Sequence, residues 1–253
     1  MTDPLDEIAA AAARGDRPLL VVSDVDGTLS PIVARATDAR LVDGARQAME
    51  RLGASDGVVA AVISGRPLHE LRDQFGFGDG VRLIGSHGLE DSDASPPTLD
   101  AAERHRLAEV GRELRMVATA VPGAWVEDKP AAAVLHVRQA TRSQGDAALA
   151  HAEVRLGQRS GVHLIPGHRV LEVAVRPASK AAALQRLRDE TGAATVVFAG
   201  DDVADEEAMA TLGPDDVGIR VGREPSVARY RVGDPTEMVA VLDALARHLA
   251  AAG

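Results

Sequence analysis

Four short segments combine acidic, hydroxyl and basic side chains that could act on a phosphate group. The first is SDVDGTL at Ser23–Leu29, in which a glycine and a threonine follow two carboxylates. One carboxylate of such a pair can serve as a nucleophile and the other as an acid or base, and the pair can bind a divalent cation. We expect these roles for Asp24 and Asp26, and phosphate binding by Thr28. An ordinary surface Asp-Gly turn is the alternative.

Two further segments offer partners for an anion. In Ser64-Gly65-Arg66-Pro67 a hydroxyl and a guanidinium flank a predicted helix start, which suits anion binding, although a simple helix cap is equally compatible. Of the 28 basic residues, all except Lys129 and Lys180 are arginine. We expect Lys180 to supply the compact ammonium that a nucleophilic carboxylate and a phosphate require. A solvated helix lysine is the alternative.

The fourth segment is an acidic run, GDDVADEE at residues 200–207. Asp201 and Asp205 are four residues apart, so in a helix they share one face. Because clustered carboxylates repel one another, and hard oxygen ligands favour Mg²⁺, the run predicts a magnesium site. Acidic residues that stabilise a helix N-terminus are the alternative, but that explains one or two of them better than five.

The elements around these segments predict an α/β fold with a parallel sheet flanked by helices. Short continuous apolar runs are typical of strands buried on both faces, and chemistry at such sheets lies beyond the carboxyl ends of the strands. The predicted strands are Pro18–Asp24, Val58–Ser64, Val81–Ser86, Ala194–Ala199 and Val217–Val221. The predicted helices of this part are Asp38–Leu52, Pro67–Phe75, Ser179–Thr191, Asp202–Leu212 and Pro235–Ala251.

The middle of the chain has a different, αββαββ pattern, which predicts a smaller inserted α+β domain. Its helices are expected at Leu99–Ala120 and Ser143–Arg159, two strands at Trp125–Val137, and a hairpin at Val162–Val175 that turns at Pro166–Gly167. We expect a core formed by residues 1–96 and 176–253, interrupted by an α+β domain at 97–175.

Composition excludes several classes of protein. The chain has 253 residues, a formal net charge of −10 and no cysteine. A nucleic-acid surface, disulfides and thiolate chemistry are therefore not expected. No apolar run reaches the length of a membrane span, and the first residues lack the pattern of a secretory signal. We expect a cytoplasmic protein.

The order of the four segments resembles the haloacid-dehalogenase-like superfamily of phosphotransferases, whose core is Rossmann-like. The resemblance implies that Asp24 attacks phosphorus, forming an aspartyl-phosphate, and that Asp26 is the general acid and base. It also implies that Thr28, Ser64 and Lys180 bind the phosphoryl group. The implied Mg²⁺ ligands are Asp24, Asp26, Asp201 and Asp205, with Asp202 farther from the metal.

Within that superfamily the chain is similar to the trehalose-6-phosphate phosphatase family. The similarity lies in GSHGLE at 85–90, WVEDK at 125–129, LHVR at 135–138 and GHRVLEV at 167–173, and in a cap inserted between Ser64 and Lys180. Two departures are EVAVRP at 172–177, where the family has EVRP, and Ala181 after the lysine. The similarity implies hydrolysis of trehalose 6-phosphate, with functional coupling to a trehalose-phosphate synthase.

A disaccharide presents many hydroxyls and therefore needs short-range donors and acceptors. The candidate sugar contacts are Arg66, His87, Glu127, Lys129 and Glu172, whereas Trp125 is expected to fill the core.

Two alternatives to this function stay open. The same chemistry could act on another sugar phosphate, such as sucrose-phosphate or a glucosyl- or mannosyl-glycerate phosphate. A regulatory domain without activity is the other, and it is disfavoured because the catalytic residue types are present.

Overall fold

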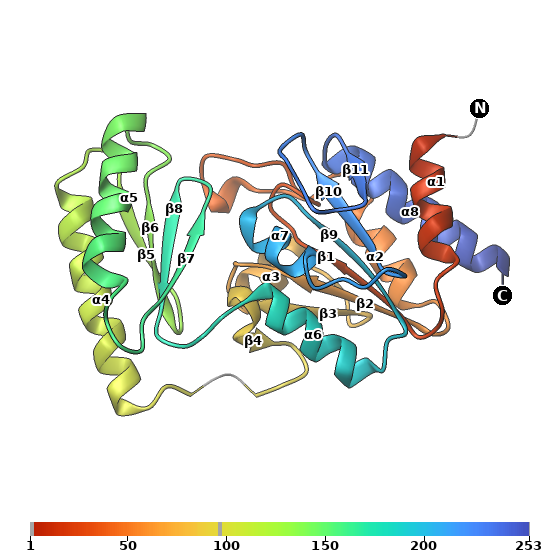
Figure 1. The fold of residues 1–253 in the computed structure, drawn as a ribbon, viewed down its shortest axis with the longest axis horizontal. Coiled ribbons are helices and arrows are strands. Elements are labelled where there is room, and N and C mark those ends of the chain that lie inside the picture. Colours follow the sequence, from red (N-terminus) through yellow and green to blue (C-terminus); the bar gives the residue numbers. More distant parts are fainter. Residues whose placement is uncertain (1–2, 96–97, 253) are drawn as a thin grey trace. The chain divides into compact units, whose positions relative to one another are not determined.

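The computed structural model describes residues 3–95 and 98–252. The chain divides into two compact units, one formed by Met1–Ser95 with Ser179–Gly253 and the other by Pro96–Ala178 (Figure 1). We call them unit 1 and unit 2. Residues 96 and 97, where the expected domain boundary falls, lie outside the described part of the chain.

Unit 1 contains a seven-stranded sheet whose central strand precedes the first acidic segment. All neighbouring strands are parallel except the last pair, which is antiparallel. Their order is β11 (Tyr230–Val232), β10 (Val217–Val221), β9 (Thr195–Gly200), β1 (Leu19–Ser23), β2 (Val58–Ile63), β3 (Val81–Gly85) and β4 (Glu90–Asp91). Ser23 is in register with Val62 and Ala199, so three chain segments leave the sheet side by side.

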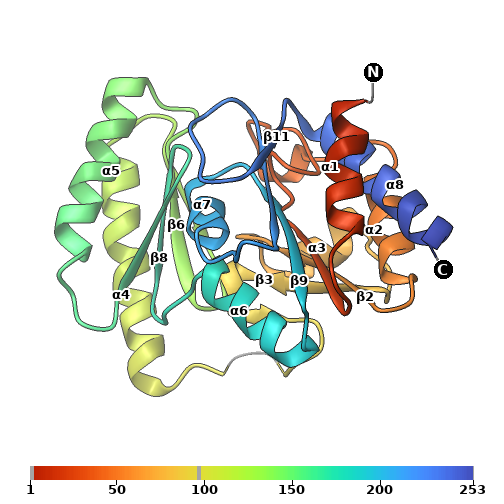
Figure 2. The ribbon, with the colours of Figure 1, turned by 45° about the vertical axis from the view of Figure 1, so that its right-hand side comes forward.

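Helices cover both faces of this sheet, which makes unit 1 a three-layer structure (Figure 2). All five residues of β1 are buried, and the four apolar side chains from Leu19 to Val22 alternate between two apolar clusters. One cluster includes residues of α1 (Pro4–Ala13), α2 (Ala45–Gly53), α3 (Leu68–Phe75) and α8 (Pro235–Ala252), and the other includes α6 (Lys180–Thr191) and α7 (Val203–Met209). The predicted α/β class is thereby confirmed.

The predicted helix at Asp38–Leu52 is wrong in its first part. A single turn of 3₁₀ helix, η1 (Ala36–Asp38), is followed by a loop, and α2 begins only at Ala45. Gly44 caps α2 with φ of +86°, a left-handed conformation that a helix interior does not contain. Leu41 and Val42 pack partly against the core from the loop, and their apolar character imitates a helical pattern. The short edge strands β4 and β11 were not predicted.

Unit 2 has the expected αββαββ order. It contains α4 (Ala101–Thr119), β5 (Trp125–Asp128), β6 (Ala132–His136), α5 (Arg142–Leu156), β7 (His163–Gly167) and β8 (Val170–Ala174). The strands form an antiparallel sheet in the order β5-β6-β8-β7. Residues of both helices share one apolar cluster with side chains from a single face of that sheet, including Leu135, Leu171 and Val173.

The hairpin of β7 and β8 turns two residues later than predicted. Pro166 and Gly167 belong to β7, and the turn is formed by His168 and Arg169, the latter with φ of +58°. Proline is tolerated here because β7 is an edge strand, where a missing backbone N–H need not break the ladder.

Among the described helices, none combines the length and the apolar character needed to cross a membrane.

Candidate active site

The centre of the site in unit 1 is an ion-pair network around Lys180. Asp24 follows β1 directly, and its backbone N–H donates to the carbonyl oxygen of Ala199 in β9 at 2.9 Å. Lys180 is the first residue of α6, whose N-cap is Ser179. Its Nζ lies 2.8 Å from Asp24 Oδ1 and 2.7 Å from Asp205 Oδ1, and all three side chains are buried. Residues separated by more than 150 positions therefore form one cluster.

A third carboxylate completes the cluster. Ligand atoms of Asp24, Asp201 and Asp205 lie within 4.8 Å of one another. Gly27 permits this approach, because a Cβ added there would lie 2.0 Å from Asp201 Oδ2, and its φ of +88° also favours glycine. Oxygen donors grouped in this way suit a hard divalent cation such as Mg²⁺.

The three carboxylates differ in how many hydrogen bonds they already accept. Asp205 accepts from Lys180 through Oδ1 and from the backbone N–H groups of Asp201 and Asp202 through Oδ2, both at 3.1 Å. Asp202 is the N-cap of α7. By contrast, Asp201 Oδ1 is buried and has no hydrogen-bond partner among the described residues. Asp24 and Asp201 are thus better placed than Asp205 to offer an oxygen to a metal.

Burial and mutual repulsion disfavour the charges of these acids. Burial raises the pKa of Asp24 well above its ordinary value; Lys180 opposes this, whereas Asp205 and Asp201 add to it. Burial and the charge of Asp205 raise the pKa of Asp201 to about 7. Burial would lower the pKa of Lys180, but attraction to Asp205 and Asp24 outweighs it and the pKa is raised. One ammonium therefore does not balance three carboxylates, and a divalent cation fits the remaining charge.

Asp26 is held by Arg66 rather than by the Lys180 cluster. Arg66 Nε lies 2.5 Å from Asp26 Oδ2, and Nη2 lies 2.8 Å from Oδ1. The other N–H groups of Arg66 donate to Glu70, Gln74 and the Ala36 carbonyl. All five donors are thus used, and the structure assigns Arg66 to orienting Asp26, whereas its sugar contact stays a prediction.

Glu70 and Gln74 support the site by holding Arg66, and neither was predicted from the sequence. They follow Arg66 at intervals of four and eight residues, and both belong to α3. Side chains at such spacings share one face of a helix. That spacing was the available signal.

The two predicted hydroxyls occupy different environments. Ser64 Oγ accepts a hydrogen bond of 3.2 Å from the backbone N–H of Arg66, so it orders the loop after β2. Thr28 Oγ1 is buried and has no hydrogen-bond partner in the described part of the chain. A buried hydroxyl is costly without a partner, and a phosphoryl oxygen would supply one.

His87 lies against the loop that contains Ser64. Its backbone N–H donates to the Ser64 carbonyl at 2.9 Å, and a Cβ added at Gly65 would lie 2.6 Å from His87 Nε2. His87 and Ser86 have φ of 53° and 48°, so this turn is strained. Glu90 supports it by accepting from Ser86 Oγ at 2.7 Å. The GSHGLE segment at 85–90 therefore places His87 beside the Ser64-Gly65-Arg66-Pro67 segment.

The remaining candidates belong to unit 2. Lys129 Nζ lies 2.5 Å from Glu172 Oε2, with both side chains almost fully buried. Glu127 Oε2 lies 2.8 Å from Nε2 of His136, a residue to which the sequence argument gave no role. Trp125 was expected to fill the core, and this is wrong, because 42% of its surface is exposed. It lies on an edge strand and stacks on His136.

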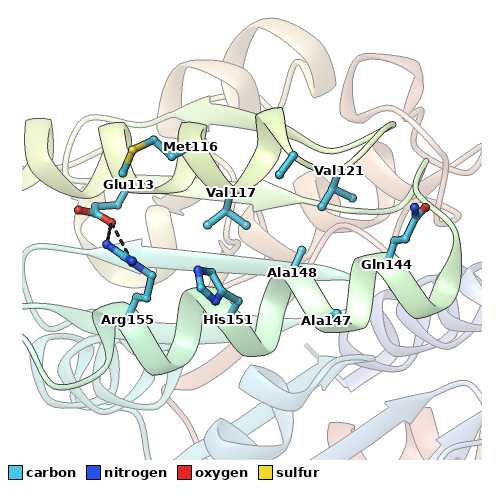
Figure 3. Close-up of a pocket in the computed structure, with 10 residues that line it drawn as sticks. Glu113, Met116, Val117, Val121, Gln144, Ala147, Ala148, His151 and Arg155 are labelled. Atoms are coloured by element: carbon cyan, nitrogen blue, oxygen red, sulfur yellow. Dashed lines mark hydrogen bonds and ion pairs between the residues drawn. The ribbon is translucent and has the colours of Figure 1, made fainter.

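A cavity of about 440 Å³ in unit 2 is separate from these candidates. It lies between α4 and α5, and Figure 3 shows Val117, Val121 and His151 pointing into it, with the Arg155–Glu113 ion pair at one end. Its lining is mainly apolar and contains none of the predicted site residues. This cavity therefore does not hold the predicted catalytic residues.

Comparisons with known proteins identify the family of the chain. The family model for trehalose-phosphatase matches residues 22–235. The trehalose-phosphate phosphatase of Mycobacterium bovis is 32% identical over 268 residues, covering 98% of this chain and 66% of that protein. A Mycobacterium tuberculosis protein named as an uncharacterized glycosyl hydrolase is 35% identical over 249 residues, covering 92% of this chain and 18% of that protein. The chain thus spans only part of these relatives.

Solved structures show the same fold. The C-terminal domain of Candida albicans trehalose-6-phosphate phosphatase has a TM-score of 0.82 at 19% identity, covering 97% of this chain and 98% of that chain. At this identity the likeness concerns the fold alone. The family match, however, extends from β1 through the acidic run to the start of α8. The predicted resemblance is confirmed, and the chain belongs to the trehalose-phosphatase family.

Proposed function

We propose that this protein is a phosphatase that hydrolyses trehalose 6-phosphate to trehalose and inorganic phosphate. The observation that carries the proposal is the convergence of Asp24, Lys180 and Asp201, and the buried Thr28 hydroxyl, which has no partner among the described residues, supports it. Family membership and the names of the relatives support the substrate.

The reaction would proceed in two steps at phosphorus. In the first, a carboxylate oxygen of Asp24 forms a bond to phosphorus while the bond to the sugar oxygen breaks, and Asp26 donates a proton to that oxygen. In the second, Asp26 takes a proton from water, which attacks phosphorus and releases phosphate and the Asp24 carboxylate. Each oxygen of Asp26 has a second lone pair besides the one that accepts from Arg66, so the carboxylate can carry this proton while Arg66 orients it.

Positioning and charge compensation would supply most of the catalysis. Lys180 would keep Asp24 ionised and bind a phosphoryl oxygen, and Thr28 and Ser64 would bind others. Asp24, Asp201 and the Asp26 carbonyl would hold Mg²⁺, which would reduce the repulsion between the carboxylate nucleophile and the anionic phosphate. Asp205 would hold Lys180 and contribute to the metal site through the turn that it stabilises.

For binding of the sugar we propose His87, Glu127, Lys129 and Glu172, with Arg66 acting through Asp26 and as a further candidate contact. In this proposal unit 1 is the catalytic core. Unit 2 corresponds to the α+β domain that was expected at 97–175, and it is the cap. Cytoplasmic location and coupling to a trehalose-phosphate synthase also belong to the proposal, and cell fractionation and co-purification would test them.

A substrate panel tests the proposed function. The full chain with Mg²⁺ is assayed for phosphate release from trehalose 6-phosphate, sucrose-phosphate, and glucosyl- and mannosyl-glycerate phosphates. We expect kcat/KM for trehalose 6-phosphate to exceed the others at least about tenfold, since one missing hydrogen-bond partner at a polar site costs this much or more. Equal rates would contradict the substrate, and no release from any of them would favour the regulatory alternative.

A further inference from the structure

One face of the unit 2 sheet carries a connected set of polar and aromatic side chains. In the register of β5, β6 and β8, Trp125 pairs with His136, and Glu127 pairs with Val134, which pairs with Glu172. Side chains directly opposite one another share a face of an antiparallel sheet. This face is opposite to the one whose leucines and valines pack against α4 and α5.

His136 is fixed from two directions on this face. Its ring stacks on the Trp125 indole with a centroid separation of 4.0 Å and an interplanar angle of 4°. Its Nε2 lies 2.8 Å from Glu127 Oε2, and since an ionised carboxylate can only accept, the imidazole is the donor. The stack sets the plane of the imidazole, and the plane sets the direction in which it holds Glu127.

Glu127 is held by one oxygen only. Its Oε1 accepts no hydrogen bond from the described residues, whereas Oε2 is engaged by His136. The hydrogen bond to His136 and attraction to Lys129 lower the pKa of Glu127, although burial opposes this. The carboxylate is therefore charged, oriented and able to accept a hydrogen bond from a ligand hydroxyl.

Trp125 offers a flat apolar surface next to this acceptor. The indole is covered by His136 on one side and remains 42% exposed. A large exposed aromatic ring is unusual in a chain whose aromatic content is 2%. A ring with one apolar face and hydroxyls at its edge, such as a pyranose, would match both features.

We propose that His136 is a positioning residue for Glu127 and that Trp125 is a stacking platform for a pyranose ring of the substrate, which rests on the proposed function. Ligand sites for neutral polar molecules combine aromatic surface with a few oriented polar groups, as this face does. Specificity for the sugar would then depend on the Trp125–His136–Glu127 contacts as well as on the Lys129–Glu172 pair.

Kinetics of matched variants test the positioning role. His136→Leu removes the donor, and we expect KM for trehalose 6-phosphate to rise about tenfold with kcat changed less than about threefold, because a hydrogen bond to a charged group is lost. The loss of kcat/KM on p-nitrophenyl phosphate, which has no sugar, should be at least about fivefold smaller. His136→Gln keeps a donor and should restore KM to within about threefold of the parent.

The control and the contrary outcomes are distinct. His105→Leu changes an exposed histidine of α4 and should leave both activities unchanged. Equal losses on both substrates in His136→Leu, or a Gln variant as impaired as the Leu variant, would overturn the positioning role. If the parent protein cleaves p-nitrophenyl phosphate but does not prefer trehalose 6-phosphate, the proposed substrate fails instead.

The platform has its own optical test, because Trp125 is the single tryptophan of the chain. Trehalose titrated into the magnesium-loaded protein should change the tryptophan emission saturably, and Trp125→Phe should retain more affinity for trehalose 6-phosphate than Trp125→Leu. An unchanged emission at trehalose concentrations that inhibit turnover would overturn the platform, as would equal KM values for the two Trp125 variants.

Discussion

Both units bury a lysine against carboxylates, but the two clusters differ in how their carboxylates are arranged. In unit 1, Lys180 contacts Asp24 and Asp205, and Asp201 lies beside them, so three carboxylates lie within 4.8 Å of one another. In unit 2, Lys129 contacts Glu172, with both side chains less than a tenth exposed, while His136 holds Glu127. Carboxylates are crowded around one lysine in the first cluster, whereas in the second each glutamate has its own donor.

The directions of the pKa shifts express this difference. Burial and repulsion raise the pKa values of Asp24 and Asp201, while a hydrogen bond from His136 and the charge of Lys129 lower that of Glu127 against the effect of burial. Crowded carboxylates suit a cation and a nucleophile, whereas carboxylates that each have a donor suit hydrogen bonding to neutral hydroxyls. Similar residue types thus prepare two different kinds of chemistry.

The largest expected effect concerns the nucleophile. Asp24→Asn should reduce kcat for trehalose 6-phosphate at least about a thousandfold, because an amide cannot form the bond to phosphorus. Phosphate release measures this, with circular dichroism as the check on folding. Asp79→Asn, an exposed aspartate of the same unit, serves as the control and should retain full activity. Substantial turnover by Asp24→Asn would remove the distinction between the two clusters.

The next largest effect is expected from the loss of the buried lysine of unit 1. Lys180→Met leaves buried carboxylates without their cation and should lower the free energy of unfolding of the metal-free protein by about 3–5 kcal/mol, with activity reduced at least about a hundredfold. Urea unfolding and phosphate release measure the two effects. A loss of stability below about 1 kcal/mol would show that Asp24 and Asp205 tolerate burial without Lys180.

Lys129→Met should also cost about 3 kcal/mol, because the Glu172 carboxylate would remain buried without the ammonium. Adding Glu172→Gln removes that buried charge and should recover most of the stability, which urea unfolding of the single and double variants would measure. A double variant no more stable than Lys129→Met would show that the loss does not come from the charge of Glu172.

Asp201 makes the stability of the metal-free protein depend on pH. Its pKa is raised from 3.8 to about 7, so the folded state holds a proton that the unfolded state releases. Stability should therefore be greatest below pH 4 for this group and should be lost as the pH rises to 7. Asp201→Asn should stabilise the metal-free protein by about 2–4 kcal/mol at pH 8 and by little near pH 4.

Thermal unfolding with and without Mg²⁺ checks this prediction. Added Mg²⁺ should stabilise the parent protein at pH 8 and should affect Asp201→Asn much less, since the substituted amide is a weaker ligand. Equal stabilisation of the two proteins by Mg²⁺ would place the metal elsewhere.

The smallest effect is expected at an ion pair outside both clusters. Arg115 and Asp128 lie 2.6 Å apart, with side chains 52% and 66% exposed. Arg115→Ala should lower the free energy of unfolding by less than about 1 kcal/mol, and the loss should diminish in high salt. A loss as large as that of Lys129→Met would mean that burial does not separate these pairs.

Much of unit 1 could be predicted because a parallel sheet buried on both faces leaves continuous apolar runs, such as that of β1. The helix expected from Asp38 was misplaced because Leu41 and Val42 are apolar for tertiary reasons, while Gly44 adopts a left-handed conformation. The exposure of Trp125 could not be predicted either, since strand order places β5 at the edge of its sheet.

By itself the sequence determined the kinds of chemistry available: carboxylates, hydroxyls and one lysine at the ends of predicted strands and helices, in an order typical of one family. Only the tertiary structure decided which groups meet. It joined Arg66 to Asp26 across 40 positions, engaged both oxygens of Asp205 and left Asp201 Oδ1 without a partner among the described residues. Spacing along the chain reports local geometry, whereas hydrogen bonds between distant segments depend on strand order and register.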